Sequence, residues 1–333
     1  MSPLAVSLGD PAGVGPELIA EAWARREEHA LPCFFAVGGA ELLCEAGQSR
    51  GLTVEIAEIA SPAEAAHAFA GALPVLDVLE GGYTPGEPSR GGAELALASL
   101  VEAARLGVSG AAGGIVTAPI AKARLAEVGF VHPGQTEFVA AACGVAAEDA
   151  VMMLAGPSLR VVPLTVHVAL AEVPRRLTTE LIVRRTRIIA RALRHDFAIA
   201  APRLAVAGLN PHAGEGGRFG DEEARIIAPA IALLRAEGIN VTGPHPADAL
   251  FASHARPGYD VALCMYHDQA LIPLKTLDFD SGVNVTLGVP VVRTSPDHGT
   301  AFAIAGKALA NPGAMIAAIR MAGECAARRA TCA

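Results

Sequence analysis

The sequence predicts an α/β protein of two domains with largely parallel sheets. Three observations point to this class. Short runs rich in Val, Ile and Leu recur along the 333-residue chain, helical stretches lie between many of them, and 52% of the residues are hydrophobic while 18% are charged. Strands that alternate with helices are typical of parallel sheets, and a chain of this length has enough apolar residues for two cores.

The predicted strands are apolar runs without a polar face, as expected for strands that are buried on both sides of a sheet. In chain order they are LAVSLG, CFFAVGG, LPVLDVL, GGIVTA, LRVVPLTV, RLAVAGL, VALCMY and VNVTLG. The predicted helices repeat apolar residues at three-to-four spacing and lie at residues 15–28, 93–107, 179–195 and 221–238.

Domain boundaries are not marked by a repeat or by a Gly/Ser-rich linker. We place them where the strand and helix pattern is interrupted, near HPGQTEF (132–138) and near Thr294. One domain would then consist of residues 1–130 with 295–333, and the other of residues 131–294.

Composition limits the class of partner. The net charge is −8, aromatic residues make up 4%, and no dense block of Lys and Arg occurs. These features argue against binding to nucleic acid or to an anionic membrane and favour a small-molecule ligand. No apolar run is long enough to span a membrane, and the opening MSPLAVSLGDP lacks the pattern of a signal peptide, so we expect a cytoplasmic protein. The six cysteines form no C-x-x-C pair, and we expect reduced, mostly buried thiols.

Three of the predicted strands run into a histidine. VVPLTVH ends at His167, LAVAGLNPH leads to His212, and VALCMYH leads to His267. Ligands of open α/β sheets bind beyond the carboxyl ends of strands, so these side chains are placed where a site would form. The alternative for each is a structural histidine that hydrogen-bonds a neighbouring backbone group.

Three neutral imidazoles suit Zn²⁺, Co²⁺, Ni²⁺ or Mn²⁺ better than Ca²⁺ and leave coordination positions open. Such an ion lowers the pKa of a bound hydroxyl and prepares the same carbon for hydride loss. Asp268 and Asp248 are candidates for orienting the ligands or for accepting the proton. Their alternative role is at the start of a helix.

Polar side chains suited to an anionic ligand follow His267. Lys275, Asn284 and Arg293 offer a point charge, an amide and a guanidinium fork. As separate residues they are also typical of a solvated surface.

Two glycine-rich stretches need separate interpretations. GDPAGVGPE (9–17) has neither the dinucleotide nor the phosphate-loop spacing, so we interpret it as a tight turn and a helix start with Pro16 and Glu17 in the first turn. NPHAGEGGRFGDEE (210–223) is a loop that either approaches a ligand or is mobile.

DHGTAFAIAGKALANP (297–312) resembles the nucleotide-binding loop of the isocitrate and isopropylmalate dehydrogenases. The resemblance implies an NAD pocket, with NADP as the other possibility. The residues that it would place in this pocket are His298, Gly299, Thr300, Ala301 and Asn311. Gly permits close backbone approach, and the amide and hydroxyl groups can bind adenine or ribose.

Motifs along nearly the whole chain resemble the 4-hydroxythreonine-4-phosphate dehydrogenase (PdxA) family of vitamin B6 synthesis. They are SLGDPAGVGPE, VTAPIAK, GQTEF, LNPHAGEGGRFGDEE, GPHPADALF, MYHDQALIPLK, VNVTLG and RTSPDHGTAFAIAG. The resemblance implies two α/β/α domains with a cleft between them, as in isocitrate and isopropylmalate dehydrogenases. It also implies a homodimer in which the partner completes each site. The implied reaction is NAD-dependent, metal-assisted oxidation of 4-phosphooxy-L-threonine, whose 3-oxo product loses CO₂ to give 3-amino-2-oxopropyl phosphate.

Residue by residue, the resemblance makes His167, His212 and His267 the ligands of a Zn, Co, Mn or Mg ion, with one of them donated across the dimer. It implies that Gln135, Thr136, Lys275, Asn284 and Arg293 bind substrate. Asp248, Asp268 and Lys275 are the candidates for proton transfer.

One departure stands out within the substrate set. The family's usual G-H-T-E reads Gly134, Gln135, Thr136 and Glu137 here, so a charge-assisted phosphate contact is lost. The departure concerns the substrate and not the type of reaction.

Four alternatives stay open at this point. Related dehydrogenases oxidise threonate or erythronate 4-phosphates, or aromatic cis-dihydrodiols, and the phosphate-type residues disfavour the dihydrodiols. A sensor that binds a phosphorylated metabolite without turnover is a third. A metal-independent transferase is disfavoured because neither a nucleophile elbow nor a phosphate-loop lysine occurs.

Overall fold

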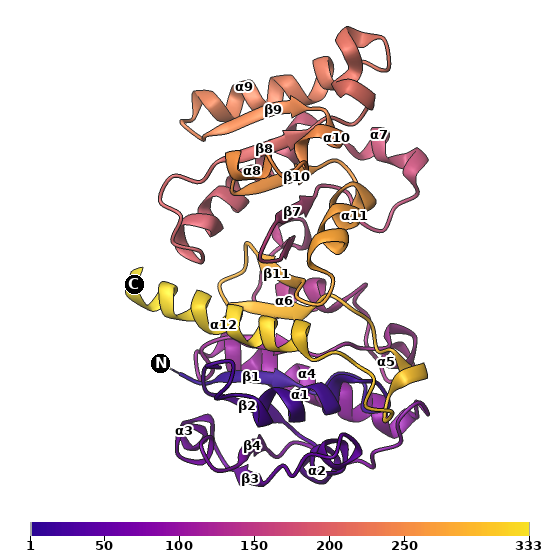
Figure 1. Ribbon diagram of the computed structural model, residues 1–333, viewed down its shortest axis with the longest axis vertical. Coiled ribbons are helices and arrows are strands. Elements are labelled where there is room, and N and C mark those ends of the chain that lie inside the picture. Colours follow the sequence, from indigo (N-terminus) through magenta and orange to yellow (C-terminus); the bar gives the residue numbers. More distant parts are fainter. Residues whose placement is uncertain (1, 333) are drawn as a thin grey trace. The chain divides into compact units, whose positions relative to one another are not determined.

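The computed structural model describes residues 2–332, which form two compact units. Unit 1 comprises the chain up to Ala147 together with Val289–Thr331, and unit 2 comprises Glu148–Gly288. In Figure 1 the last, yellow segment accordingly lies with the indigo N-terminal strands. The units divide after residues 147 and 288, whereas the sequence pattern suggested 130 and 294, so residues 131–147 belong with the N-terminal strands.

Unit 1 is a parallel sheet with strand order β3-β4-β2-β1-β5-β12. Its strands are β1 (Leu4–Ser7), β2 (Phe34–Val37), β3 (Ile56–Ile59), β4 (Leu73–Leu76), β5 (Ile115–Thr117) and β12 (Arg293–Pro296). Its helices are α1 (Gly15–Ala24), α2 (Ala40–Ser49), α3 (Ala65–Ala68), α4 (Arg90–Val108), α5 (Lys122–Glu127), α6 (Gln135–Ala142) and α12 (Gly313–Cys332).

Unit 2 has strand order β11-β6-β7-β10-β8-β9, parallel from β7 to β9 and antiparallel at β6. Its strands are β6 (Val151–Ala155), β7 (Arg160–Pro163), β8 (Leu204–Ala207), β9 (Val241–His245), β10 (Val261–Cys264) and β11 (Val283–Leu287). Its helices are α7 (Val173–Arg176), α8 (Thr179–His195), α9 (Ala228–Ala236), α10 (Ala247–Leu250) and α11 (His267–Asp278). The two-domain α/β prediction is therefore confirmed.

All eight predicted strands form, and four strands were missed. The missed edge strands, β3 and β9, are partly exposed, and β9 contains Gly and Pro. The other two missed strands are β6, whose centre is methionine, and β12, whose four residues RTSP are all buried although none is aliphatic. Aliphatic content alone therefore identifies the sheet interior and misses strands that are buried for another reason.

Of the predicted helices, α8 has the expected bounds because the Thr178 hydroxyl caps it, accepting from the Leu181 amide at 3.1 Å. The stretch 221–238 begins instead with a π-helical turn at Glu223–Ile227, and α9 follows it. The π-turn places Glu223 in a buried position beneath the loop that carries His212, so the irregularity lies next to a candidate site residue.

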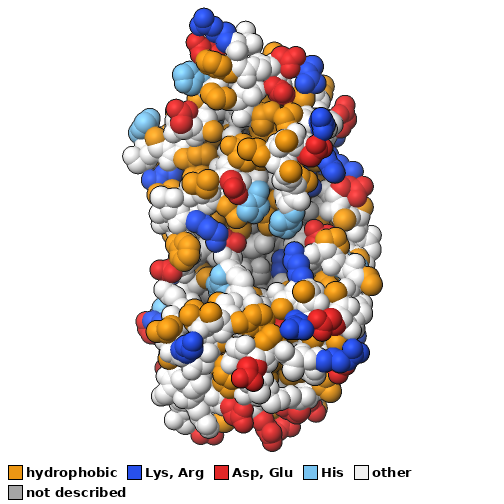
Figure 2. All heavy atoms as spheres, turned by 90° about the vertical axis from the view of Figure 1, so that its right-hand side faces the viewer, with side chains coloured by type: hydrophobic (Ala, Val, Ile, Leu, Met, Phe, Trp, Pro, Cys, Tyr) orange, Lys and Arg blue, Asp and Glu red, His pale blue; other side chains and the backbone are white. Residues whose placement is uncertain are grey.

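The surface and the thiols agree with the sequence in part. Within residues 2–332 no helix is both long and apolar enough to cross a bilayer. Basic and acidic side chains are interspersed over the face drawn in Figure 2.

Five thiols are free in the described part of the chain: Cys264 and Cys325 are buried, but Cys33, Cys44 and Cys143 are only half-buried. Three of these five thiols are thus less buried than predicted.

A buried ion-pair network fixes the segment after β12 to the start of unit 1. Glu17 of α1 is fully buried, and burial raises the pKa of its carboxyl, an effect that the charge of Arg50 opposes. The Arg50 guanidinium contacts Glu17 at 3.4 Å, pairs with Glu21 and donates to the Ala310 carbonyl at 3.0 Å. Glu17 also accepts from the backbone of Gly306. The network therefore anchors the segment that contains the predicted cofactor loop.

Replacing Arg50 with Ala should lower the free energy of unfolding by about 3–5 kcal/mol, because Glu17 would be left as an uncompensated buried charge. Urea denaturation followed by circular dichroism measures this. The matched control is Arg90→Ala, since Arg90 pairs with Glu94 at 3.1 Å on the surface, and its loss should cost no more than about 1 kcal/mol. Equal effects of the two substitutions would contradict the structural role of the network.

Candidate active site

Two of the three strand-end histidines lie together in unit 2. β7 and β10 are parallel neighbours, so the segments that follow them emerge at the same edge of the sheet. His167 follows β7 in a loop, His267 is the first residue of α11, and their ring centroids are 5.9 Å apart. The Thr165 hydroxyl ties the two segments by donating to the Met265 carbonyl at 2.8 Å. The strand-end argument thus placed this pair correctly.

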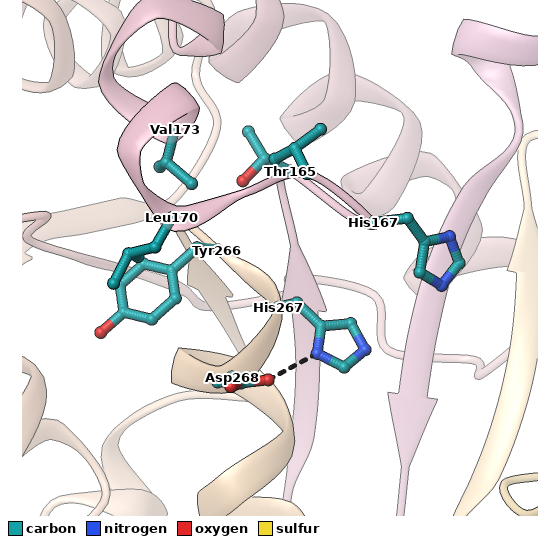
Figure 3. Close-up of a pocket in the computed structure, with 8 residues that line it drawn as sticks. Thr165, His167, Leu170, Val173, Tyr266, His267 and Asp268 are labelled. Carbon is teal, nitrogen blue, oxygen red and sulfur yellow. Dashed lines mark hydrogen bonds and ion pairs between the residues drawn. The ribbon is translucent and has the colours of Figure 1, made fainter.

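Asp268 contacts the ring of His267. The Nδ1 atom of His267 is 2.7 Å from Oδ1 of Asp268, the contact drawn dashed in Figure 3. A carboxylate on one ring nitrogen fixes the orientation of the imidazole and directs the other nitrogen, Nε2, towards a ligand. Asp268 also lies in the first turn of α11, the alternative role that the sequence left open, and the two roles are compatible here.

The histidine pair borders a cavity of about 240 Å³ within unit 2. Its lining residues are Thr165, His167, Val168, Leu170, Val173, Tyr266, His267 and Asp268. Figure 3 shows the Tyr266 ring beside Leu170, on the opposite side of the drawn residues from His167. The cavity therefore combines an apolar wall with the imidazoles, which is typical of small-molecule sites.

His212 is not part of this pair. It follows β8 in the loop Pro211–Gly217, its side chain is 68% exposed, and its Nδ1 is 3.4 Å from Oε2 of Glu215. Across residues 2–332 the structure brings no three His, Cys, Asp or Glu side chains close enough to hold one metal ion. Within a single chain two imidazoles meet, and a third ligand from a second chain stays a prediction.

The loop that carries His212 has an unusual backbone. Six residues in succession, His212 to Gly217, have positive φ. Buried Glu223 holds the preceding turn, because its Oε1 accepts from the Leu209 and Asn210 amides at 2.8 Å each. Backbone in this region is costly for residues other than glycine and persists only where its surroundings enforce it. The sequence left a close-approach loop and a mobile loop open, and this choice stays a prediction.

Three further predicted residues of unit 2 lie on separate elements. Lys275 is in the last turn of α11, with its Nζ 5.4 Å from the centre of the Phe279 ring. Asn284 is on β11, and its buried Oδ1 has no hydrogen-bond partner among the residues described. A buried acceptor without a partner is costly, which suits a ligand that donates to it. Asp248 is exposed in the first turn of α10, a helix that contacts the loop of His212.

In unit 1 the structure joins Gln135, Thr136 and Arg293. Arg293 is 2% exposed, and its Nη2 donates to Oε1 of Gln135 at 2.7 Å and to the Thr117 hydroxyl at 2.6 Å. Its Nη1 lies 3.4 Å from the Thr136 hydroxyl. Burial lowers the pKa of Arg293 to about 10, which the charge of Glu137 opposes, so the guanidinium stays protonated at neutral pH. Gln135 and Thr136 open α6, whose N-terminus favours anions.

Sequence reasoning missed Thr117 as part of this group. Thr117 ends β5, inside the quoted motif VTAPIAK, and its position at a strand end was the available signal. It also missed Asp10 in the turn after β1, a carboxyl that is 2% exposed and whose pKa is raised by burial. Oδ1 of Asp10 accepts from the Ala12 amide at 3.0 Å, and Oδ2 has no partner among the described residues.

The predicted cofactor loop packs against the turn Gly9–Val14. The Val14 amide donates to the Thr300 carbonyl at 2.9 Å, and a Cβ atom on Gly13 would lie 2.8 Å from that oxygen. Only glycine therefore fits at position 13 without a shift. The interpretation of residues 9–17 as a tight turn and helix start is confirmed, with Gly9 at φ +69° and α1 beginning at Gly15.

The other predicted cofactor residues are spread over the same segment. Nδ1 of His298 is 3.0 Å from the Gly299 carbonyl, and Ala301 has a left-handed backbone. Asn311 caps the last helix, because its Oδ1 accepts from the Gly313 amide at 2.8 Å. That leaves its amide NH₂ as the group able to reach a ligand. Whether these residues bind a nucleotide stays a prediction.

Comparison with known proteins gives a consistent family. The family model described as pyridoxal phosphate biosynthetic protein PdxA matches residues 30–322. A 4-hydroxythreonine-4-phosphate dehydrogenase of Erythrobacter litoralis is 64% identical over 98% of each chain. The crystal structure of a 4-hydroxythreonine-4-phosphate dehydrogenase from Klebsiella pneumoniae is 38% identical over 98% of each chain, with a TM-score of 0.85.

A more distant relative carries a different activity in its name. The terephthalate 1,2-cis-dihydrodiol dehydrogenase of Burkholderia xenovorans is 31% identical over 97% of this chain and 98% of its own, with a TM-score of 0.66. The identity is thus much higher to the phosphothreonine enzymes, over nearly the whole length. On the match of the family model and on these identities, the chain belongs to the pyridoxal phosphate biosynthetic protein PdxA family.

Proposed function

We propose that the protein oxidises 4-phosphooxy-L-threonine with NAD, in the synthesis of pyridoxal 5′-phosphate. The C3 hydroxyl gives up its proton to a base, and C3 passes a hydride to the nicotinamide. The product is 2-amino-3-oxo-4-phosphooxybutanoate. As a β-keto acid it loses CO₂ to give 3-amino-2-oxopropyl phosphate. Relatives named for this activity, up to 64% identical, support the assignment.

The observation that carries the substrate class is Arg293. It is a protonated guanidinium, almost fully buried, held by neutral side chains at the N-terminus of α6. A buried cation with donors beside it is suited to a phosphate. The terephthalate dihydrodiol named for the Burkholderia relative carries ring carboxylates, which a guanidinium also binds, so Arg293 supports an anionic substrate and the 64% identity favours the phosphorylated one.

His167 and His267 fit a divalent metal, since their rings are adjacent and Asp268 fixes one of them. When bound there, Zn²⁺, Co²⁺, Mn²⁺ or Mg²⁺ would lower the pKa of the substrate hydroxyl. His212, exposed on an ordered loop, would be the third ligand, presented to the site of a partner subunit in a homodimer. Asp268 is occupied in holding His267, so Asp248 and Lys275 are the candidates for taking up the hydroxyl proton.

The remaining predicted residues would bind the substrate and the cofactor. Thr136, Lys275, Asn284 and Arg293 would bind substrate, as the resemblance to the family implies. The segment from His298 to Ala301, with Asn311, would bind NAD, and NADP is the alternative cofactor. The free thiols of the described chain support a reducing, cytoplasmic location.

The purified protein should form NADH when mixed with NAD, a divalent metal and 4-phosphooxy-L-threonine, measured as absorbance of the reduced nicotinamide. Threonate 4-phosphate and erythronate 4-phosphate test the closest alternative substrates, and a cis-dihydrodiol tests the other. A higher kcat/KM for a sugar-acid phosphate would replace the proposed substrate. Binding without NADH formation would point to a metabolite sensor.

Replacing His267 or His212 with Ala should abolish metal binding at the site and turnover, because each removes a ligand. Asp268→Asn should weaken metal affinity by about 10- to 100-fold, since it removes the group that orients His267. Calorimetric titration with Zn²⁺ and the turnover assay measure these effects. His195→Ala, at an exposed position in the last turn of α8, is the matched control and should change neither.

Mixing the inactive His212→Ala and His267→Ala proteins under conditions of subunit exchange should restore about a quarter of the sites, because one site of each mixed dimer regains both ligands. Mixing His167→Ala with His267→Ala should restore none, since both of those ligands come from one subunit. Recovered turnover in the second mixture, or none in the first, would contradict the shared site. Sedimentation velocity checks that dimers are present.

A further inference from the structure

The side-chain amide of Gln135 is held by three partners, which fix its orientation. Arg293 has only donors, so the atom 2.7 Å from its Nη2 must be the oxygen Oε1. The Ala118 carbonyl can only accept, so the atom 3.0 Å from it must be the nitrogen Nε2. The Thr117 hydroxyl donates to Oε1 at 2.8 Å. Each end of the amide therefore has a partner of the right kind.

Little of this amide is left for a ligand. A glutamine side chain accepts two hydrogen bonds and donates two. Oε1 accepts from Thr117 and Arg293, and Nε2 donates to Ala118, which leaves a single N–H. The Thr117 hydroxyl in turn accepts from Nη2 of Arg293 at 2.6 Å, so the three side chains close a triangle. The triangle constrains the guanidinium more tightly than any one contact would.

Gln135 and Thr117 hold Arg293 without cancelling its charge, because an amide and a hydroxyl are both neutral. The charge of Glu137, in the first turn of α6, also acts on Arg293. A carboxylate in place of the Gln135 amide would form an ion pair with the guanidinium and compete with an incoming anion. An amide supplies the same acceptor geometry without that competition.

We propose that Gln135 is a positioning residue, which holds the guanidinium of Arg293 towards the substrate phosphate and does not itself bind the phosphate. This rests on the proposed function in one respect, that the substrate is phosphorylated. Within this group, Arg293 alone would bind the phosphate. The role of the glutamine therefore differs from the direct contact expected from the sequence.

A double-mutant cycle with inorganic phosphate as the probe tests the inference. Gln135→Leu should weaken phosphate binding in calorimetry about tenfold and raise the KM for 4-phosphooxy-L-threonine similarly, with kcat within about twofold. In an Arg293→Ala background the same change should weaken binding by less than about twofold, because there is no guanidinium left to position. If Arg293→Ala does not fold, Arg293→Lys replaces it, since an ammonium has no planar fork for the amide to hold.

Two further variants sharpen the result. Gln135→Glu should weaken phosphate binding at least as much as Gln135→Leu, because it pairs with Arg293. Gln48→Leu, an exposed glutamine on α2, is the matched control and should have no effect. Circular dichroism confirms that each variant is folded.

The outcomes separate this inference from the proposed function. A tenfold loss from Gln135→Leu in the Arg293-substituted background would show that the amide binds phosphate directly and would overturn the inference. Unchanged phosphate binding after Gln135→Leu in the otherwise native protein would also overturn it. Failure of the unsubstituted protein to bind millimolar phosphate would do the same. Phosphate binding with the predicted cycle but no NADH formation would count against the dehydrogenase and leave the role of Gln135 intact.

Discussion

Both candidate groups of residues depend on one constraint, the fixed register in which parallel strands pair. In unit 2, β7 and β10 are neighbours, and the residues after them, His167 and His267, meet at the same edge of the sheet. In unit 1, Arg293 begins β12 opposite Ile115 of β5, and its side chain reaches the Thr117 hydroxyl at the end of β5. Residues distant in the sequence become neighbours because the backbone hydrogen bonds of buried strands permit one register.

The protein buries charge in two different ways within unit 1. Arg50 is matched by Glu17 and Glu21, so that network is compensated internally and serves to hold the segment 297–312. Nη2 of Arg293 donates to an amide and a hydroxyl, which are neutral and do not cancel its charge. Removing one partner of a buried ion pair is costly, whereas a buried cation held by neutral groups suits the anionic ligand proposed above. The contrast lies in the partners and not in the depth of burial.

Much of this was predictable from the sequence, for identifiable reasons. Aliphatic runs gave eight strands, and the strand-end position of His167 and His267 gave their proximity. The sequence does not show which group each polar side chain hydrogen-bonds. The expected phosphate contact of Gln135 followed from its motif, whereas its actual hydrogen bonds depend on where β5 and β12 lie. The burial of Asp10 and Glu17 could not be predicted, because a carboxylate that becomes buried looks like a surface one in a sequence. His212 shows the other limit, since it follows a strand like the other two histidines but contacts Glu215 of its own loop and does not line their cavity.

The left-handed backbone that begins at His212 would matter for the proposed homodimer. Glu223 holds the Leu209 and Asn210 amides that lead into this backbone, so the anchor is already present in a single subunit. In such a dimer, the partner would receive an imidazole whose loop is anchored at its base. An anchor of this kind reduces the entropy that association costs at this point, which is how preorganisation adds affinity.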